Sequence, residues 1–260
     1  MKTSIIIPVY NEERTIERIL KKVLASPIEK EVIVVNDGST DKTLEILGKY
    51  KKEITYVSHQ KNLGKGRAIS TGLKYVSGEI VLIQDADLEY DPSEYQNLIK
   101  PILEKKAKVV YGSRWLRKKK FKPSVFYFGT QFLTWVTNLL YGTEITDESC
   151  GYKVFDTKLL KSLKLESKRF EFCPEVTAKL AKKGVQIIEV PIKYTPRSIN
   201  EGKKIKWRDG IMALFTLLRY RFAWEKVGIS LFLLWTIFIL ALYIKELLCR
   251  GGICLNWRLP

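Results

Sequence analysis

The chain contains 260 residues and carries 45 Lys and Arg against 28 Asp and Glu, which gives a formal net charge of +17. Its 46% hydrophobic content excludes a disordered chain, and one histidine with four scattered cysteines excludes a zinc cluster and a disulfide scaffold. Any metal ion must therefore use oxygen ligands, and the positive charge favours nucleic acid, an anionic membrane surface or a phosphorylated substrate as partner.

Up to about residue 115, short β-branched runs alternate with amphipathic helical stretches. Strands are expected at 4–9, 31–35, 54–58, 79–83 and 108–111, and helices at 12–24, 40–50, 66–76 and 92–105. This alternation predicts an α/β fold, a Rossmann-like and mostly parallel sheet with helices on both faces. Ligands of such sheets bind beyond the carboxyl ends of the strands.

Polar clusters follow three of the expected strands, at 11–13, 36–41 and 85–87. Each cluster alone is compatible with a turn or a helix cap, but their recurrence at one sheet edge indicates a binding site. Asp85 and Asp87 flank a small residue at the end of a buried strand, and Glu89 follows them. Such carboxylates suit Mg²⁺ or Mn²⁺, which would bridge a diphosphate and neutralise its charge as it leaves.

Residues 62–67 match neither the dinucleotide-binding pattern nor the P-loop pattern. We interpret them as a turn that leads into a helix near the diphosphate, with Lys65 and Arg67 supplying positive charge. A plain helix N-terminus is the alternative.

The C-terminal quarter indicates a membrane. Residues 227–244 form an uncharged apolar run of about 27 Å as a helix, so 226–246 is expected to be a transmembrane helix, followed by a tail at 247–260; a buried core helix is the alternative. Residues 207–225 have the composition of an amphipathic helix in the membrane interface, or of one packed on the catalytic domain, 1–206. Because acidic residues interrupt the N-terminal apolar run, no signal peptide is recognised, and we expect the catalytic domain on the cytoplasmic side of the cell membrane.

Five motifs, PVYNE, NDGSTD, NLGKG, DAD and GSR, together resemble those of family 2 glycosyltransferases, which have the GT-A fold. Across residues 3–210 the chain looks like the polyprenyl-phosphate sugar synthases of the dolichol-phosphate mannose synthase group. The resemblance implies a nucleotide-sugar donor, a divalent metal and inverting transfer of a hexose to polyprenyl or dolichyl phosphate. Mannose from GDP-mannose is the expected donor group, and UDP-glucose or another UDP-sugar is the alternative.

The resemblance also implies roles for side chains at the donor site. Pro8, Tyr10 and Glu12 are expected to line the nucleotide pocket, and Val35 and Asp37 to hold the base and ribose. The acidic motif is expected to contact donor and metal through Asp85, Ala86 and Asp87, with Glu89 as a further metal ligand.

Cationic residues are expected beside the phosphates. Arg114 would lie against the donor and acceptor phosphates, while Arg197 and Lys203 match a mobile basic loop that closes over the diphosphate. Lys204 is an equally good match for the second cation. The residues assigned to catalysis are Asp87, Arg114 and Asp147.

The chain departs from the best-known mannose synthases at the acceptor side. Their helix after GSR carries an Arg for the acceptor phosphate, but residues 124–141 contain no Arg or Lys; Arg117 and the lysines at 118–120 are nearby substitutes. A lipid phosphate is already ionised and needs no strong base, whereas a sugar hydroxyl would need Asp147 or Glu175 to remove its proton. A membrane-tethered nucleic-acid binder is a distant alternative, because aromatic residues are not interleaved with the basic ones.

Overall fold

A computed structural model describes residues 1–117, 125–197, 202, 204, 205 and 207–222. The chain divides into two compact units, Met1–Leu218 and Arg219–Pro260, and the second is described only over 219–222. Lys203, the basic run at 118–120, the predicted transmembrane helix at 226–246 and the tail at 247–260 lie outside the described residues. Among the described residues, no helix combines the length and apolarity needed to cross a membrane.

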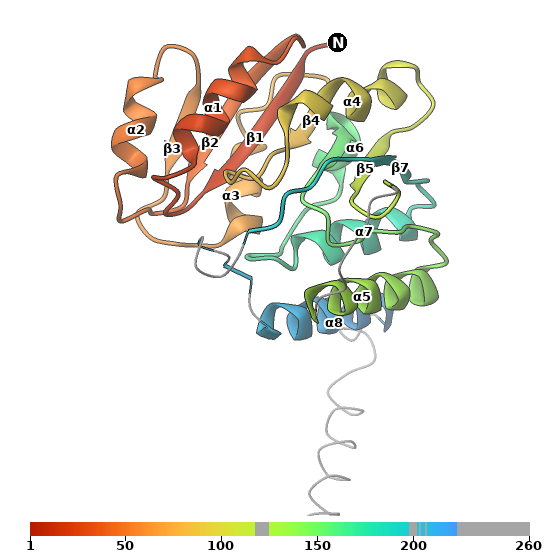
Figure 1. The fold of residues 1–260 in the computed structure, drawn as a ribbon. Helices are drawn as coiled ribbons and strands as arrows, with labels where there is room; N and C mark the ends of the chain where they lie inside the picture. The colour runs from red at the N-terminus through yellow and green to blue at the C-terminus, as the bar shows by residue number, and fades with distance from the viewer. Residues whose placement is uncertain (118–124, 198–201, 203, 206, 223–260) are drawn as a thin grey trace, which may run out of the picture. The chain divides into compact units, whose positions relative to one another are not determined.

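A seven-stranded mixed sheet forms the centre of the first unit (Figure 1), in the order β3-β2-β1-β4-β6-β5-β7. The parallel pairs are β1 with β2 and β4, β2 with β3, and β5 with β7, whereas β6 runs antiparallel to both β4 and β5. The strands are β1 (Thr3–Val9), β2 (Lys30–Asn36), β3 (Thr55–Ser58), β4 (Ile80–Ile83), β5 (Val109–Ser113), β6 (Lys153–Asp156) and β7 (Ile188–Pro191).

Helices cover both faces of the sheet, as the sequence pattern predicts. One face carries α1 (Ile16–Ala25), α2 (Thr43–Lys49) and α4 (Tyr95–Leu103), which follows the 3-10 turn η1 (Pro92–Glu94). The other face carries α3 (Lys65–Gly72), α6 (Thr157–Ser162) and α7 (Phe172–Lys182). Within the described part of the chain, the remaining helices are α5 (Val125–Tyr141) and α8 (Trp207–Phe222).

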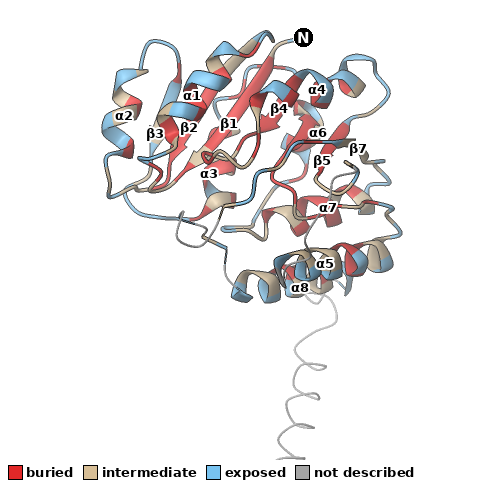
Figure 2. Ribbon diagram, in the orientation of Figure 1, coloured by how far each residue is buried: buried red, intermediate tan, exposed pale blue. Residues whose placement is uncertain are grey.

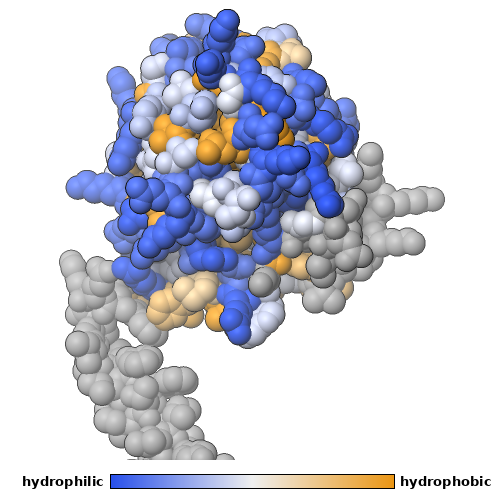
Figure 3. All heavy atoms as spheres, turned by 90° about the vertical axis from the view of Figure 1, so that its left-hand side faces the viewer, coloured by the Kyte–Doolittle hydropathy of each residue, from blue (hydrophilic) through white to orange (hydrophobic). Residues whose placement is uncertain are grey.

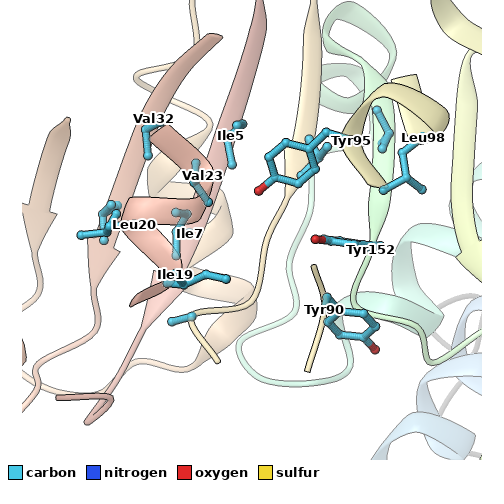
Figure 4. Packing of buried hydrophobic residues seen from close by; sticks show 14 of the residues in the cluster. Ile5, Ile7, Ile19, Leu20, Val23, Val32, Tyr90, Tyr95, Leu98 and Tyr152 are labelled. Atoms are coloured by element: carbon cyan, nitrogen blue, oxygen red, sulfur yellow. The ribbon is translucent and has the colours of Figure 1, made fainter. Parts of the chain in front are cut away.

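Alternation along the central strand divides the core between the two faces. Ile5 and Ile7 of β1 pack with α1 and α4 in one cluster, whereas Ile6 packs with α3 and α7 in the other. Figure 4 shows the first cluster at close range, and Figure 2 shows that the central strands are buried while the helices expose their outer faces. Burial on both faces fixes the register of the central strands and therefore where each strand ends.

The partly buried carboxylate of Glu31 ties together the starts of three strands. It accepts hydrogen bonds from Lys2 Nζ (2.7 Å), from the Ser4 hydroxyl, and from the Ser77 backbone N–H (2.7 Å) ahead of β4. Burial alone would raise its pKa, but these hydrogen bonds together lower the pKa of Glu31 to about 2. The ionised form is therefore the one that stabilises the fold.

Replacing this carboxylate tests its contribution to stability. Because the folded-state pKa is lowered, its stabilisation is present above the ordinary value of 4.5 and is lost as the pH falls towards about 2. We expect Glu31→Gln to lower the free energy of unfolding at neutral pH and the difference from wild type to shrink over that acidic range, as measured by urea unfolding. Glu29→Gln, at a neighbouring side chain that is 71% exposed, is the control; an equal loss there would contradict the assignment.

Candidate active site

The three polar clusters predicted from the sequence meet at one edge of the sheet. Asn11, after β1, donates its backbone N–H to the Ser39 hydroxyl (2.9 Å) and accepts from the Thr40 N–H (2.8 Å), so the first two clusters interlock. Arg197 then connects the first cluster to the third, since its guanidinium contacts both Glu12 and Asp87. The prediction of a common edge is therefore confirmed.

Asp37, after β2, is held by the chain around it. Its carboxylate accepts hydrogen bonds from the backbone N–H groups of Leu63 (2.9 Å) and Gly64 (2.7 Å), and it lies 2.7 Å from Nδ1 of His59. The other ring nitrogen of His59 lies 2.9 Å from the Thr71 hydroxyl. The expected nucleotide-pocket residue thus also joins β2 to the turn before α3, a link that the sequence does not reveal.

Buried tyrosines fix the backbone just before the acidic motif. The side-chain oxygen of Gln84 accepts hydrogen bonds from the hydroxyls of Tyr95 and Tyr152, both at 2.7 Å, and its amide nitrogen donates to the Asp85 carbonyl (2.9 Å). The rings of these tyrosines lie in the core cluster (Figure 4). A Cβ atom on Gly151 would lie 2.3 Å from Oδ2 of Asp85 and 2.9 Å from the Tyr90 ring, so a larger residue here would displace that carboxylate from its present position.

The two aspartates of the acidic motif face different cations. Lys65 Nζ lies 2.5 Å from Oδ1 of Asp85, and Arg197 Nη2 donates to Oδ2 of Asp87 at 2.7 Å. Burial, with the charges of Asp85 and Glu89, raises the pKa of Asp87 to about 7, against the opposing effect of Arg197. An additional positive charge at this carboxylate would therefore be favourable.

Two cations of the segment after β7 lie over this acidic edge. The guanidinium of Arg197 lies 3.0 Å from Glu12 Oε1, and its backbone N–H donates to Glu89 (2.9 Å). Lys204 Nζ donates to Glu12 Oε1 (2.8 Å) and to the Tyr10 carbonyl. Of the two expected lysines, the described one, Lys204, is thus at the edge.

Arg114, after β5, forms a buried bidentate ion pair with Asp147. Asp147 Oδ2 accepts from Arg114 Nε and Oδ1 from Nη2, both at 2.7 Å, and the carboxylate is fully buried. Glu189 of β7 accepts from the backbone N–H of Asp147 (3.0 Å) and holds its loop. This geometry favours a positioning role for Asp147 over removal of a proton. Glu189, which the sequence analysis did not identify, is a further residue that supports the site.

The remaining sequence candidates lie in different surroundings. Pro8 and Val35 are register partners in β1 and β2, Ala86 is buried, and its carbonyl accepts from the Thr15 hydroxyl (3.1 Å).

Within the described residues, no three His, Cys, Asp or Glu side chains are grouped closely enough to hold a metal ion by themselves. A cation at this edge would have to complete its coordination with phosphate oxygens and water, as Mg²⁺ commonly does.

Breaking the buried pair should leave Arg114 without its counter-charge. We expect Asp147→Asn to lower the free energy of unfolding by about 3–5 kcal/mol, because a lone buried charge is costly. The double variant Arg114→Met with Asp147→Leu is expected to recover most of that loss in urea unfolding. A double variant as unstable as the single one would show that the pairing of charges is not what matters.

Comparison with known proteins finds a family, relatives and solved structures that the chain resembles. Residues 4–163 match the family model described as Glycosyl transferase family 2. The UDP-N-acetylglucosamine--dolichyl-phosphate N-acetylglucosaminyltransferase of Methanococcus voltae is 32% identical, over 77% of this chain and 89% of that protein. A dolichyl-phosphate beta-glucosyltransferase of Trichomonas vaginalis is 31% identical, over 78% and 68% respectively. The crystal structure of Mycobacterium tuberculosis glucosyl-3-phosphoglycerate synthase with Mg²⁺ and UDP shares the fold, with a TM-score of 0.65 at 21% identity over 85% of this chain and 79% of that one.

Proposed function

Because the chain belongs to glycosyl transferase family 2, we propose that it transfers a sugar from a nucleoside-diphosphate donor to a polyprenyl or dolichyl phosphate at a membrane surface. The observation that carries the proposal is the sheet edge where two aspartates face separate cations. A transferase of this kind is preferred to the nucleic-acid-binding alternative, because its site needs both carboxylates and phosphate-binding cations.

The acidic edge supports the use of a divalent cation. Asp87 has a raised pKa and contacts Arg197, so its environment favours added positive charge. We propose that Asp87 and Asp85 hold Mg²⁺ or Mn²⁺, with Glu89 within the same cluster. The ion, when bound, supplies charge neutralisation for the departing diphosphate. Pro8, Tyr10, Glu12, Val35 and Asp37 remain the proposed nucleotide-pocket residues.

The cationic side chains would then bind the phosphate groups of the substrates. Arg197 and Lys204 lie over the acidic edge, where they would exchange carboxylate contacts for diphosphate oxygens once the donor is bound. Arg114 is held rigidly by Asp147 at the end of β5, where it would orient a phosphate. An acceptor phosphate is ionised at neutral pH, so inverting attack needs positioning more than proton removal.

The surface of α5 and α8 supports a lipid acceptor. Phe128, Phe132, Trp135 and Leu139 follow a helical spacing along α5, and their exposed fractions lie between 52% and 67%. Helix α8 runs beside α5 (Figure 1), linked by the hydrogen bond from the Tyr141 hydroxyl to the Leu217 carbonyl (2.6 Å).

Helix α8 also exposes apolar side chains, those of Ile211, Met212 and Phe215. Helix α5 has no charged residue. By contrast, the side of the molecule that carries α2 and β3 is covered mainly by hydrophilic residues (Figure 3). A large exposed apolar surface suits contact with a bilayer, which must supply the polyprenyl chain.

The donor sugar is the finer part of the proposal. The sequence resemblance predicts mannose from GDP-mannose, whereas the two relatives described above are named for N-acetylglucosamine and glucose transfer. We therefore propose a hexose-type donor. Its identity is decided by supplying GDP-mannose, UDP-glucose and UDP-N-acetylglucosamine in parallel and comparing the rates of transfer.

The decisive test is formation of a lipid-linked sugar by the full chain. Radiolabelled donors are incubated with polyprenyl phosphate and Mn²⁺, and the products are separated by thin-layer chromatography. We expect one donor to label the lipid, with equimolar release of nucleoside diphosphate, and Asp87→Asn to reduce turnover by at least about 100-fold, because a ligand of the neutralising ion is lost. Chelation with EDTA should have the same effect on wild type.

Glu13→Gln is the matched control, since Glu13 lies next to Glu12 but is exposed and contacts the Lys42 backbone N–H. It is expected to keep wild-type turnover. Full activity of Asp87→Asn, or of the chelated enzyme, would remove the acidic motif from the mechanism.

The apolar face makes a separate prediction. We expect Phe132→Asp with Trp135→Asp to reduce transfer to polyprenyl phosphate in liposomes by about tenfold or more, because the charges oppose contact with the bilayer. Transfer to a water-soluble short-chain isoprenyl phosphate should stay within about twofold of wild type. Leu44→Asp, at an exposed leucine of α2, is the control; an equal loss with both acceptors would contradict a role in membrane contact.

A further inference from the structure

The start of α3 lacks a capping side chain and is closed by a distant loop. Its N-cap residue is Gly64, which has no side chain to accept a hydrogen bond from the first turn. Instead, the backbone N–H of Gly66 donates to the Arg169 carbonyl and that of Arg67 to the Lys168 carbonyl, both at 3.1 Å. Amides that usually need a local cap are therefore satisfied by residues about one hundred positions later in the chain.

Two glycines permit this close contact. A Cβ atom on Gly64, which has φ +97°, would lie 2.3 Å from the Lys168 carbonyl oxygen. A Cβ atom on Gly66 would lie 2.4 Å from the Ser167 carbonyl oxygen. Both distances are far below van der Waals contact, so the NLGKG turn fits this loop only with glycine at each position.

The loop is in turn held by one buried carboxylate of α7. Glu175 is fully buried, and its two oxygens accept separately from the backbone N–H groups of Glu166 (2.8 Å) and Ser167 (2.7 Å). Lys179, one turn further along the helix, lies 2.6 Å from Oε1. Burial raises the pKa of Glu175, but the hydrogen bonds from Lys179 and Ser167 outweigh it and leave the pKa below its ordinary value.

Lys65 connects this assembly to the acidic motif. It lies between the two glycines as the first residue of α3, and its ammonium group pairs with Asp85 at 2.5 Å. The Lys65 side chain is only 17% exposed. The next two residues of the helix, Gly66 and Arg67, make the backbone contacts with the 166–169 loop described above. The position of Lys65 is thus set by backbone on both sides of it.

We propose that Glu175 is a positioning residue of the donor site. Its carboxylate holds the 166–169 loop against the start of α3, and the loop holds Lys65 beside Asp85. The consequence for transfer rests on the proposed function, whereas the mechanical link does not. Glutamine cannot replace this side chain, because two N–H donors face two oxygens and an amide offers only one acceptor.

Hydrogen exchange of the full chain without nucleotide tests the link directly. We expect Glu175→Gln to accelerate exchange at the amides of Gly66 and Arg67 by at least about tenfold relative to wild type, because their acceptors move away. Gly66→Ala should loosen the same contact from the opposite side and give the same local change. Glu166→Gln, the same chemical change at a side chain of this loop that is 59% exposed, is the matched control.

A double-mutant cycle tests the consequence. Glu175→Gln is expected to lower kcat/KM for the active donor by about 10–100-fold. When Glu175→Gln is combined with Lys65→Met, kcat/KM should fall no further than in Lys65→Met alone, because both changes act on one contact. Rescue of kcat/KM by Glu175→Asp towards the wild-type value would support the need for a carboxylate.

Unchanged exchange at Gly66 and Arg67 in a folded Glu175→Gln protein would overturn the proposal, as would multiplicative losses in the cycle. If no donor is transferred by wild type, the proposed function fails, and the exchange measurement alone still decides whether Glu175 holds the turn.

Discussion

Concentrated negative charge at one sheet edge is the constraint on which the rest of this structure depends. Glu12 follows β1, whereas Asp85, Asp87 and Glu89 follow β4, and burial makes their mutual repulsion costly. Lys65 of α3 and the two cations of the segment after β7, Arg197 and Lys204, offset that charge. A site built this way is suited to substrates that carry their own phosphates and cations, since each can exchange places with a group already present.

The packing beneath the edge explains how such charges are kept in register. Gln84 is fixed by two tyrosine hydroxyls from α4 and the β6 side of the sheet, and Gly151 leaves space for the carboxylate that follows. Arg114 is fixed by Asp147, whose loop is fixed by Glu189. Buried hydrogen bonds therefore connect the site residues to the hydrophobic core and hold them in position.

Sequence patterns predicted the five N-terminal strands and the convergence of the acidic clusters, because hydrophobic runs and strand-end turns leave strong local signals. They did not predict β6, a four-residue strand that contains the buried Lys153 and runs against its neighbours. They also left Asp147 as a candidate base, since its bidentate contact with Arg114 joins residues 33 positions apart. Long-range pairings of this kind follow from topology, which no local window contains.

The closed start of α3 has a consequence for how phosphate is recognised. In many nucleotide-binding folds, free amides at a helix N-terminus receive the phosphate directly. Here the amides of Gly66 and Arg67 are already engaged by carbonyl oxygens, so these two donors are not available to an anion. A phosphate bound at this edge would instead have to contact cationic side chains, such as those of Arg197 and Lys204, or a metal ion.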